Sequence, residues 1–265
     1  MNFELIFDEI EIIRNCIINE IPYSDTGKLI RAGIGLLLIK GYNIEFSEEL
    51  KNVLIAVELM HNASLLHDDV IDNASQRRGE SACNIKNNNS IAVLTGDLLF
   101  AKSMEYIRDI KSYEIFNIFN KTMINMCKGE LKQLNNKWKI PDIDSYLNIC
   151  ELKTATLFLT IFRSVSILSE DKIPNDIKYV AKYFGIAYQI KNDLQDATDK
   201  QNDIENGIYT APVIFSGGTD ITKAAIEKTS GLIDNYSRKA ITSLKLMSDS
   251  CYKKELIRIA QCLNE

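Results

Sequence analysis

Carboxylates gather at two places in this chain that lie more than a hundred residues apart. Asp68, Asp69 and Asp72 stand inside the stretch LLHDDVIDNASQRRGE, and a second cluster, NDLQD, covers residues 192–196. Each cluster lies within a run of helical periodicity. Two sets of carboxylates on two helices can face each other across a cavity and hold several Mg²⁺ ions, as the binding and ionisation of a diphosphate requires. The pairing indicates an enzyme.

The first cluster ends the inward face of a predicted helix. Ser47 is a good start for this helix, because its hydroxyl can accept a free backbone N–H and two glutamates follow it. An apolar stripe then runs at steps of three and four residues and ends in Asp68 and Asp72, which are one turn apart. Asp69 is rotated by about 100° and is expected to support them. The plainer alternative is a solvated helix end with local charge pairs.

Two arginines beside the first cluster favour the metal site. Arg77 and Arg78, followed by Gly79, place two guanidiniums next to the carboxylates. A guanidinium can bind diphosphate oxygens with paired hydrogen bonds, so it suits a diphosphate that is bridged to Mg²⁺. The pair therefore weighs against a solvated helix end.

The second cluster repeats the pattern of an apolar stripe that turns polar. Gln189, Asn192 and Asp196 share one helix face, Asp193 stands beside them, and Lys200 follows one turn later. One helix end could thus supply metal ligands and an ammonium for phosphate. Taken alone, the segment is more typical of an exposed helix end rich in amides and acids, and only its pairing with the first cluster favours a metal site.

Composition places these clusters in one globular domain. The chain has 265 residues, 46% of them hydrophobic, and a net charge of −5 with both signs interspersed, so a nucleic-acid partner is not expected. We find no linker, repeat or low-complexity tract, and we predict a single domain over residues 1–265. The acidic amino terminus and the lack of a long apolar run predict no stable membrane insertion and a cytoplasmic location.

Four prolines, twelve glycines and almost no alternating pattern predict an all-α fold. The clearest break is the loop KNNNS at 86–90. The expected helices cover residues 3–20, 28–41, 47–73, 90–108, 112–136, 143–169, 175–199 and 210–216, with two or three further pieces from 219 onward.

Several further motifs, in the same order and spacing, resemble the trans-isoprenyl diphosphate (polyprenyl) synthases, which condense isopentenyl diphosphate with an allylic diphosphate. The resemblance runs from about Gly27 to Phe215. Its motifs are GKLIR at 27–31, ELMH at 58–61, RRGE at 77–80, AVLTGDLLFA at 92–101, GELKQ at 129–133, KTATLF at 153–158 and DIENGIYTAPVIF at 203–215, besides the two acidic clusters. The resemblance implies a helical bundle around a central cavity, normally a homodimer.

The resemblance also implies roles for individual residues. It assigns Asp68, Asp72, Asn192 and Asp196 to three Mg²⁺ ions, Arg77 and Lys200 to the allylic diphosphate, and Lys28, Arg31, His61 and Arg78 to isopentenyl diphosphate. Lys153, Thr154 and Gln189 would lie near the breaking bond, with Lys153 protonated. Without the resemblance, His61 could be a core histidine, Thr154 and Gln189 ordinary polar groups of helices, and Lys28 and Arg31 a solvated helix start.

Small residues stand about one turn before the first cluster. At these positions, short-chain relatives commonly have an aromatic side chain that closes the channel for the growing product. Ala63 and Ser64 stand there, and the TAPVIF ending resembles enzymes that make quinone side chains. We therefore expect a medium or long all-trans product. Alternatively, Ala63 merely permits close helix packing.

Three departures from the family pattern keep other readings open. Asn192 replaces the usual leading aspartate, so one Mg²⁺ should bind less tightly. Ile208 stands where many relatives have lysine, and the chain is short at both ends. A non-catalytic or regulatory subunit of a heteromeric synthase is the main alternative. A class I terpene cyclase fits less well, because it needs no second diphosphate pocket.

Overall fold

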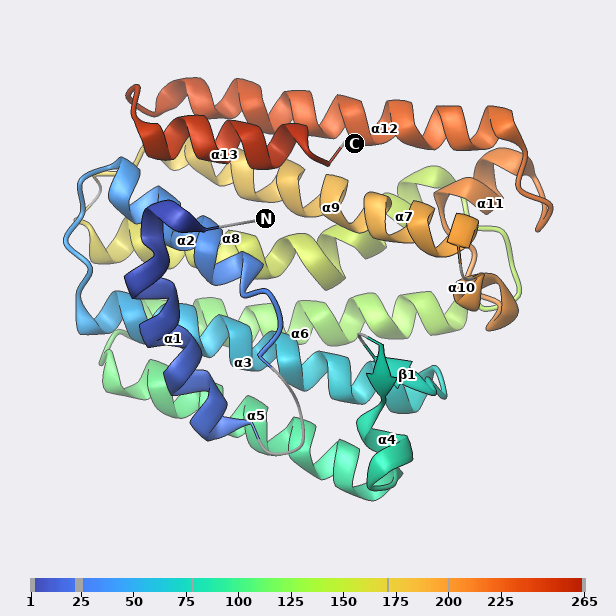
Figure 1. The fold of residues 1–265 in the computed structure, drawn as a ribbon, viewed down its shortest axis with the longest axis horizontal. Helices are drawn as coiled ribbons and strands as arrows, with labels where there is room; N and C mark the ends of the chain where they lie inside the picture. The colour runs from blue at the N-terminus through green and yellow to red at the C-terminus, as the bar shows by residue number, and fades with distance from the viewer. Residues whose placement is uncertain (1–2, 22–25, 78, 171, 200, 264–265) are drawn as a thin grey trace.

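The computed structural model describes residues 3–21, 26–77, 79–170, 172–199 and 201–263, and in them the chain is a bundle of α-helices (Figure 1). The predicted all-α fold is confirmed. The longer helices are α1 (Phe7–Glu20), α2 (Ile30–Gly41), α3 (Glu48–Ile71), α5 (Asn89–Asp109), α6 (Tyr113–Asn135), α8 (Thr156–Leu168), α9 (Lys178–Asp199), α12 (Lys223–Ser243) and α13 (Cys251–Gln261).

Short elements connect these helices. The sequence had not predicted the hairpin of β1 (Gln76–Arg77) and β2 (Glu80–Ser81), in which Arg77 pairs with Glu80. The remaining elements are α4 (Cys83–Lys86), α7 (Ile143–Cys150), the π-helical turn η2 (Glu151–Ala155), α10 (Asn202–Glu205), α11 (Ala211–Ser216) and the 3₁₀ turns η1 (Glu4–Ile6), η3 (Asn175–Ile177) and η4 (Leu244–Leu246).

Side-chain caps fix where several helices begin. Ser47 accepts a hydrogen bond from the backbone N–H of Leu50 at 3.3 Å, which confirms the predicted start of α3. Asp142 likewise accepts from the N–H of Ser145 at 2.7 Å and begins α7. Such caps satisfy backbone donors that have no partner within the helix.

Helix α8 is the centre of the bundle. It packs against α2, α3, α6 and α9. Eight of its thirteen residues are buried, with Phe158 and Phe162 the largest. The core formed in this way extends from Phe3 to Leu263, and the single domain over 1–265 remains a prediction.

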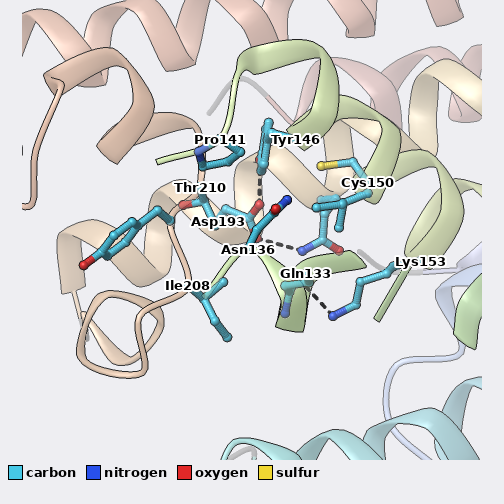
Figure 2. A pocket seen from close by; sticks show the side chains of 12 residues that line it. Gln133, Asn136, Pro141, Tyr146, Cys150, Lys153, Asp193, Ile208 and Thr210 are labelled. Carbon is cyan, nitrogen blue, oxygen red and sulfur yellow. Dashed lines mark hydrogen bonds between the residues drawn. The ribbon is translucent and has the colours of Figure 1, made fainter. Parts of the chain in front are cut away.

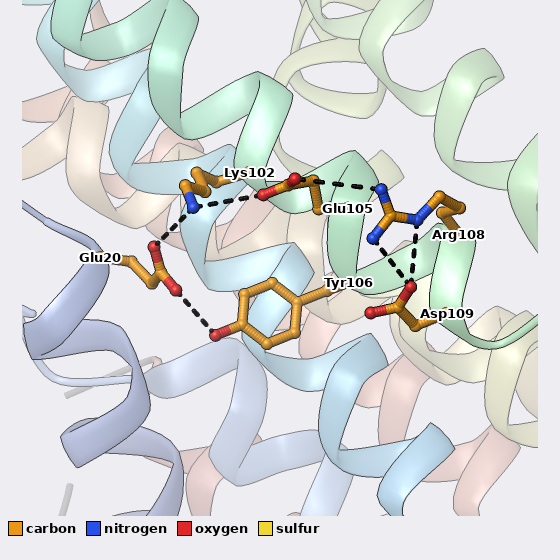
Figure 3. Close-up of polar contacts among 6 residues, drawn as sticks. All are labelled: Glu20, Lys102, Glu105, Tyr106, Arg108 and Asp109. Carbon is orange, nitrogen blue, oxygen red and sulfur yellow. Dashed lines mark hydrogen bonds and ion pairs between the residues drawn. The ribbon is translucent and has the colours of Figure 1, made fainter.

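A polar cluster fastens α1 to α5 (Figure 3). The hydroxyl of Tyr106 donates to Glu20 at 3.1 Å, and Lys102 lies 3.7 Å from the other oxygen of the same carboxylate. Burial is the larger cause and the charge of Glu20 the next in raising the pKa of Tyr106 to about 12. The hydroxyl therefore keeps its proton and donates the hydrogen bond. The contact holds the first long helix on the bundle.

The carboxyl end of α3, the hairpin and α10 lie at one end of the bundle, on the right of Figure 1. Both acidic clusters therefore belong to the same end of the molecule. Among the described residues, no helix has the length and apolar character needed to cross a membrane.

Candidate active site

The two acidic clusters lie within electrostatic reach of each other. Burial raises the pKa of Asp203, which follows α9, to about 8. The charges of Asp193, Asp196 and Asp72 add to this effect, so residues from both clusters act on one carboxyl group. Asp72 caps the carboxyl end of α3, and Asp196 stands in the last turns of α9. Carboxyl groups at the ends of α3 and α9 thus act on one another electrostatically.

Lys153 is the cation at the centre of this site. Its ammonium forms an ion pair with Glu130 of α6 and lies 3.2 Å from the amide oxygen of Gln133. Burial alone would lower the pKa of Lys153, but the charges of Asp68, Glu130 and Asp72 raise it, and the net direction is upward. The raised pKa favours the protonated form of Lys153.

Asp68 is held partly neutral by its surroundings. Burial raises the pKa of its carboxyl group to about 7. Lys153 lowers this pKa, whereas Glu130 and Asp72 raise it again. The pKa of Asp72 is raised too, mainly by burial and then by Glu130. Both carboxylates would gain from a divalent cation that stabilises their charged forms.

A π-helical turn carries Lys153 and Thr154. The sequence predicted one continuous helix over 143–169, but the structure interrupts it with η2, between α7 and α8. A π-turn inserts one extra residue into a helical turn, so the side chains after it are rotated relative to those before it. Such turns are frequent at functional sites. Lys182 of α9 binds this turn by donating to Glu151 at 2.8 Å.

Two glycines allow the neighbouring helices to approach the π-turn closely. A Cβ atom at Gly129 of α6 would lie 2.7 Å from Cγ of Lys153, and one at Gly185 of α9 would lie 2.5 Å from the Cα atom of Ala155. Real Cβ atoms do not come so close to other atoms. The two glycines therefore let α6 and α9 pack tightly around the turn that carries Lys153.

A pocket opens beside Lys153 (Figure 2). Gln189 and Asp193 of α9 line it, together with Tyr146 of α7 and Ile208, which stands where many relatives have lysine. Its remaining lining residues are Gln133, Asn136, Pro141, Ile149, Cys150, Tyr209 and Thr210. The pocket therefore adjoins three of the residues that the sequence placed in the site, Lys153, Gln189 and Asp193.

Asp69 supports the site by holding Arg77. Asp69 is 2% exposed, and Arg77 donates to its side chain through Nε at 2.8 Å and through a second guanidinium nitrogen. Asn84 donates to the backbone oxygen of Asp69 at 3.3 Å. The contact fixes the hairpin on the end of α3, so Arg77 stands beside Asp68 and Asp72.

The described residues suit a divalent cation that is shared with a diphosphate. One oxygen of Asp72 is buried without a hydrogen-bond partner. A bound cation would satisfy this oxygen. On α9, Asp196 accepts from the N–H of Asp203 at 2.9 Å through one oxygen, and Asn192 is exposed. No three His, Cys, Asp or Glu side chains of the described residues converge to enclose an ion. Water and phosphate oxygens would complete the coordination.

The residues expected to bind isopentenyl diphosphate lie in different environments. Lys28 is exposed just before α2, and His61 is half-buried on α3. Arg31 is buried, with its guanidinium 5.3 Å from the ring centre of Phe158. Arg78 and Lys200, the two other predicted phosphate ligands, lie outside the described residues.

The sequence analysis missed three residues of the site. Glu130 pairs with Lys153, Tyr146 binds Asp193, and Asp203 adds a carboxyl group next to Asp196. Glu130 and Asp203 stand inside GELKQ and DIENG, two stretches that supported the resemblance, so a signal for them was present. Tyr146 gave no signal, because its partner is 47 residues away along the chain.

Comparison with known proteins identifies the family of this chain. The model of the family described as polyprenyl synthetase matches residues 17–246. The chain belongs to the polyprenyl synthetase family. It is 30% identical over 235 residues to heptaprenyl diphosphate synthase component 2 of Geobacillus stearothermophilus, covering 84% of this chain and 73% of that protein. It is 31% identical to the decaprenyl-diphosphate synthase of Dictyostelium discoideum, covering 88% of this chain and 59% of that one.

Solved structures show the same fold in other members. Heptaprenyl diphosphate synthase from Staphylococcus aureus superposes with a TM-score of 0.87 at 23% identity, covering 100% of this chain and 98% of that one. A polyprenyl synthase from Caulobacter crescentus, solved with calcium and isoprenyl diphosphate, superposes with a TM-score of 0.86 at 21% identity. The match covers 98% of this chain and 95% of that one. This polyprenyl synthetase is thus a prenyltransferase, and its family uses divalent metal with diphosphate substrates.

The first prediction concerns the glycines around the π-turn. Gly185→Ala should destabilise the fold by about 1–3 kcal/mol, because the new methyl group overlaps the backbone of Ala155. Gly231→Ala is the control, since Gly231 lies in α12 with open space around it and alanine favours a helix by about 1 kcal/mol. Urea unfolding measures both, and equal effects of the two changes would contradict the packing argument.

The second prediction concerns Asp68. Its pKa in the fold lies above that of an ordinary aspartate, so its ionisation destabilises the metal-free protein as pH rises from about 4 to 7. Asp68→Asn removes that ionisation. The Tm of the variant should exceed that of the wild type by more at pH 8 than at pH 5. A variant that is less stable than the wild type at pH 8 would show that the Asp68 charge is well solvated or compensated.

Proposed function

We propose that this chain condenses isopentenyl diphosphate with an allylic diphosphate, in a Mg²⁺-dependent reaction, to give a medium or long all-trans polyprenyl diphosphate. The observation that carries the proposal is the placement of Lys153 within electrostatic reach of the carboxylates of α3 and of α9. A site of this kind can bind a diphosphate through cations and through one protonated lysine. Family membership supports the same reaction class.

The proposed metal ligands are Asp68 and Asp72 on α3 and Asn192 and Asp196 on α9. Bound Mg²⁺, which we place at three ions, would neutralise the charge that develops on the departing diphosphate. The raised pKa values of Asp68 and Asp72 in the metal-free protein support this role, because these groups gain charge stabilisation from a cation. Asn192 offers only a carbonyl oxygen, so we expect a higher Mg²⁺ requirement than in members with aspartate there.

The protein groups around the reacting bond have complementary roles. The protonated Lys153 donates to the leaving diphosphate and, being charged, does not attack the allylic cation. The oxygens of Thr154 and Gln189 face the positive charge as it forms, and Arg77, fixed by Asp69, binds the allylic diphosphate. The double bond of isopentenyl diphosphate attacks the cation, and the departing pyrophosphate accepts the proton that is lost.

The second substrate is proposed to lie toward α2. Lys28, Arg31, His61 and Arg78 form the pocket for isopentenyl diphosphate in this proposal, and Lys200 joins Arg77 on the allylic diphosphate. This pocket needs no metal, because cationic side chains bind the phosphate oxygens directly. Arg31 brings a buried positive charge to it.

Product length is proposed from the small residues before the first cluster. Ala63 is fully buried, and the hydroxyl of Ser64 donates to the backbone oxygen of His61 at 2.8 Å. Neither side chain can close a channel as an aromatic ring would. Relatives named as heptaprenyl, hexaprenyl and decaprenyl synthases support a medium or long product.

The surface of α5 and α6 supports a homodimer. Leu94 and Leu98 of α5 are exposed one turn apart, and Phe116, Ile124 and Leu131 are exposed on one face of α6. Leu94 is 65% exposed and Leu131 is 59% exposed, which is costly for large aliphatic side chains in water. A second copy of the chain would cover both helices.

A specific observation keeps a second function open. The Geobacillus relative is named component 2 of its synthase, and Asn192 weakens one metal site, so the chain could act with a partner subunit and be inactive alone. A class I terpene cyclase remains the third, weaker candidate. For all three candidates, the cytoplasm remains our predicted compartment.

The third prediction separates these functions. We expect the purified chain, incubated with Mg²⁺, farnesyl diphosphate and isopentenyl diphosphate, to give prenyl diphosphates longer than farnesyl. Mass spectrometry of the products is the measurement, and Asp68→Ala, which should abolish the reaction, is the control. A cyclic hydrocarbon would indicate a cyclase, and no product would indicate a subunit that needs a partner. Products that stop at farnesyl length would refute the proposal that Ala63 and Ser64 leave the product channel open.

The fourth prediction concerns assembly. The wild type should have about twice the 30.1 kDa mass of one chain in light scattering, and Leu131→Glu should have the mass of a monomer, because a charge would be buried in the interface. Leu246→Glu is the matched control, since Leu246 is an exposed aliphatic residue of η4, which packs against α12 and η3. A monomeric wild type, or a dimer unaffected by Leu131→Glu, would contradict the proposed interface.

A further inference from the structure

Tyr146 of α7 forms a buried hydrogen bond with an aspartate of the second acidic cluster. Its hydroxyl donates to Oδ2 of Asp193 at 2.6 Å (Figure 2). Tyr146 is 4% exposed and Asp193 is 6% exposed. A hydrogen bond from a hydroxyl to a buried carboxylate is short and strong, and its loss leaves a charged acceptor without a partner.

The same carboxylate continues the hydrogen bonds into the π-turn. Oδ1 of Asp193 accepts from Nε2 of Gln189 at 2.7 Å, and Oε1 of Gln189 accepts from the hydroxyl of Thr154 at 2.5 Å. Tyr146, Asp193, Gln189 and Thr154 thus form one chain of hydrogen bonds. It joins α7, α9 and η2 and ends beside Lys153.

This chain determines which way the Gln189 amide points. A carboxylate only accepts hydrogen bonds, so the amide nitrogen of Gln189 must face Asp193 and its oxygen must face Thr154. Tyr146 occupies the second oxygen of Asp193 and prevents that carboxylate from turning away. Asp193 therefore decides the orientation of the Gln189 amide, and Tyr146, two hydrogen bonds away from that amide, holds Asp193 in place.

We propose that Tyr146 is a positioning residue for the condensation: it holds Asp193, and Asp193 holds the Gln189 and Thr154 oxygens toward the developing allylic cation. This inference rests on the proposed function. Tyr146 is not one of the residues that we assign to the substrates or the metals. Its effect reaches the reaction only through the orientation of two dipoles, which act on the transition state more than on substrate binding.

Tyr146→Phe tests the role, because it removes the hydroxyl and keeps the ring. The kcat should fall by about tenfold to a hundredfold, while KM for both substrates stays within about twofold. Tyr106→Phe is the matched control, since it also removes a bond from a tyrosine to a carboxylate, that of Glu20, but between α1 and α5 (Figure 3). Its kcat should equal that of the wild type.

A double-mutant cycle distinguishes positioning from a general loss of structure. If Tyr146 acts through Thr154, the kcat of Tyr146→Phe with Thr154→Val should be within about threefold of that of Thr154→Val alone. Losses that multiply, an unchanged kcat for Tyr146→Phe, or KM values that rise in proportion would overturn the proposal.

A spectroscopic measurement keeps the inference testable if the purified chain makes no product, an outcome that would defeat only the proposed function. The side-chain amide signal of Gln189 in NMR, assigned by its absence in Gln189→Leu, should exchange slowly with water in the wild type. Exchange should be faster in Tyr146→Phe and unchanged in Tyr106→Phe. Equal exchange in all three proteins would overturn the positioning role.

Discussion

The half-buried ion pair between Lys153 and Glu130 is the interaction on which the site depends. Without a cation at this place, Asp68, Asp72 and Glu130 would bring like charges together in a partly buried space, at a cost of several kcal/mol. The lysine offsets that cost only in part, because the pKa of Asp68 still rises to about 7. The metal-free site therefore retains unfavourable electrostatics that a bound cation would relieve, as is common where function competes with stability.

Backbone geometry places this lysine. The π-turn of residues 151–155 adds one residue to an otherwise regular helix, and the glycines at 129 and 185 let α6 and α9 close around it. Lys153 is thereby set between the end of α3 and the end of α9. The hydrogen bonds from Thr154 through Gln189 and Asp193 to Tyr146 fix the other polar face of the same turn. One irregular turn thus orients the groups proposed to act on both the leaving group and the cation.

Local signals in the sequence predicted most of the fold, because caps and hydrophobic periodicity act within a few residues. The expected helices at 47–73 and 112–136 correspond to Glu48–Ile71 and Tyr113–Asn135. The π-turn was missed, since one extra residue leaves the periodicity of each half intact and its support comes from distant glycines. The hairpin at 76–81 was too short to give an alternating pattern. Tyr146 was missed for a similar reason, as its role depends on a partner in another helix.

The central claim is that a diphosphate and its cations occupy the space between the ends of α3 and α9. The most direct measurement is the anomalous scattering of Mn²⁺ in crystals grown with an unreactive thio analogue of farnesyl diphosphate. The account predicts one set of Mn²⁺ peaks about 2.0–2.2 Å from the oxygens of Asp68 and Asp72 and another next to Asn192 and Asp196, with the diphosphate between them. Mn²⁺ bound only at the protein surface, or a diphosphate outside this space, would contradict it.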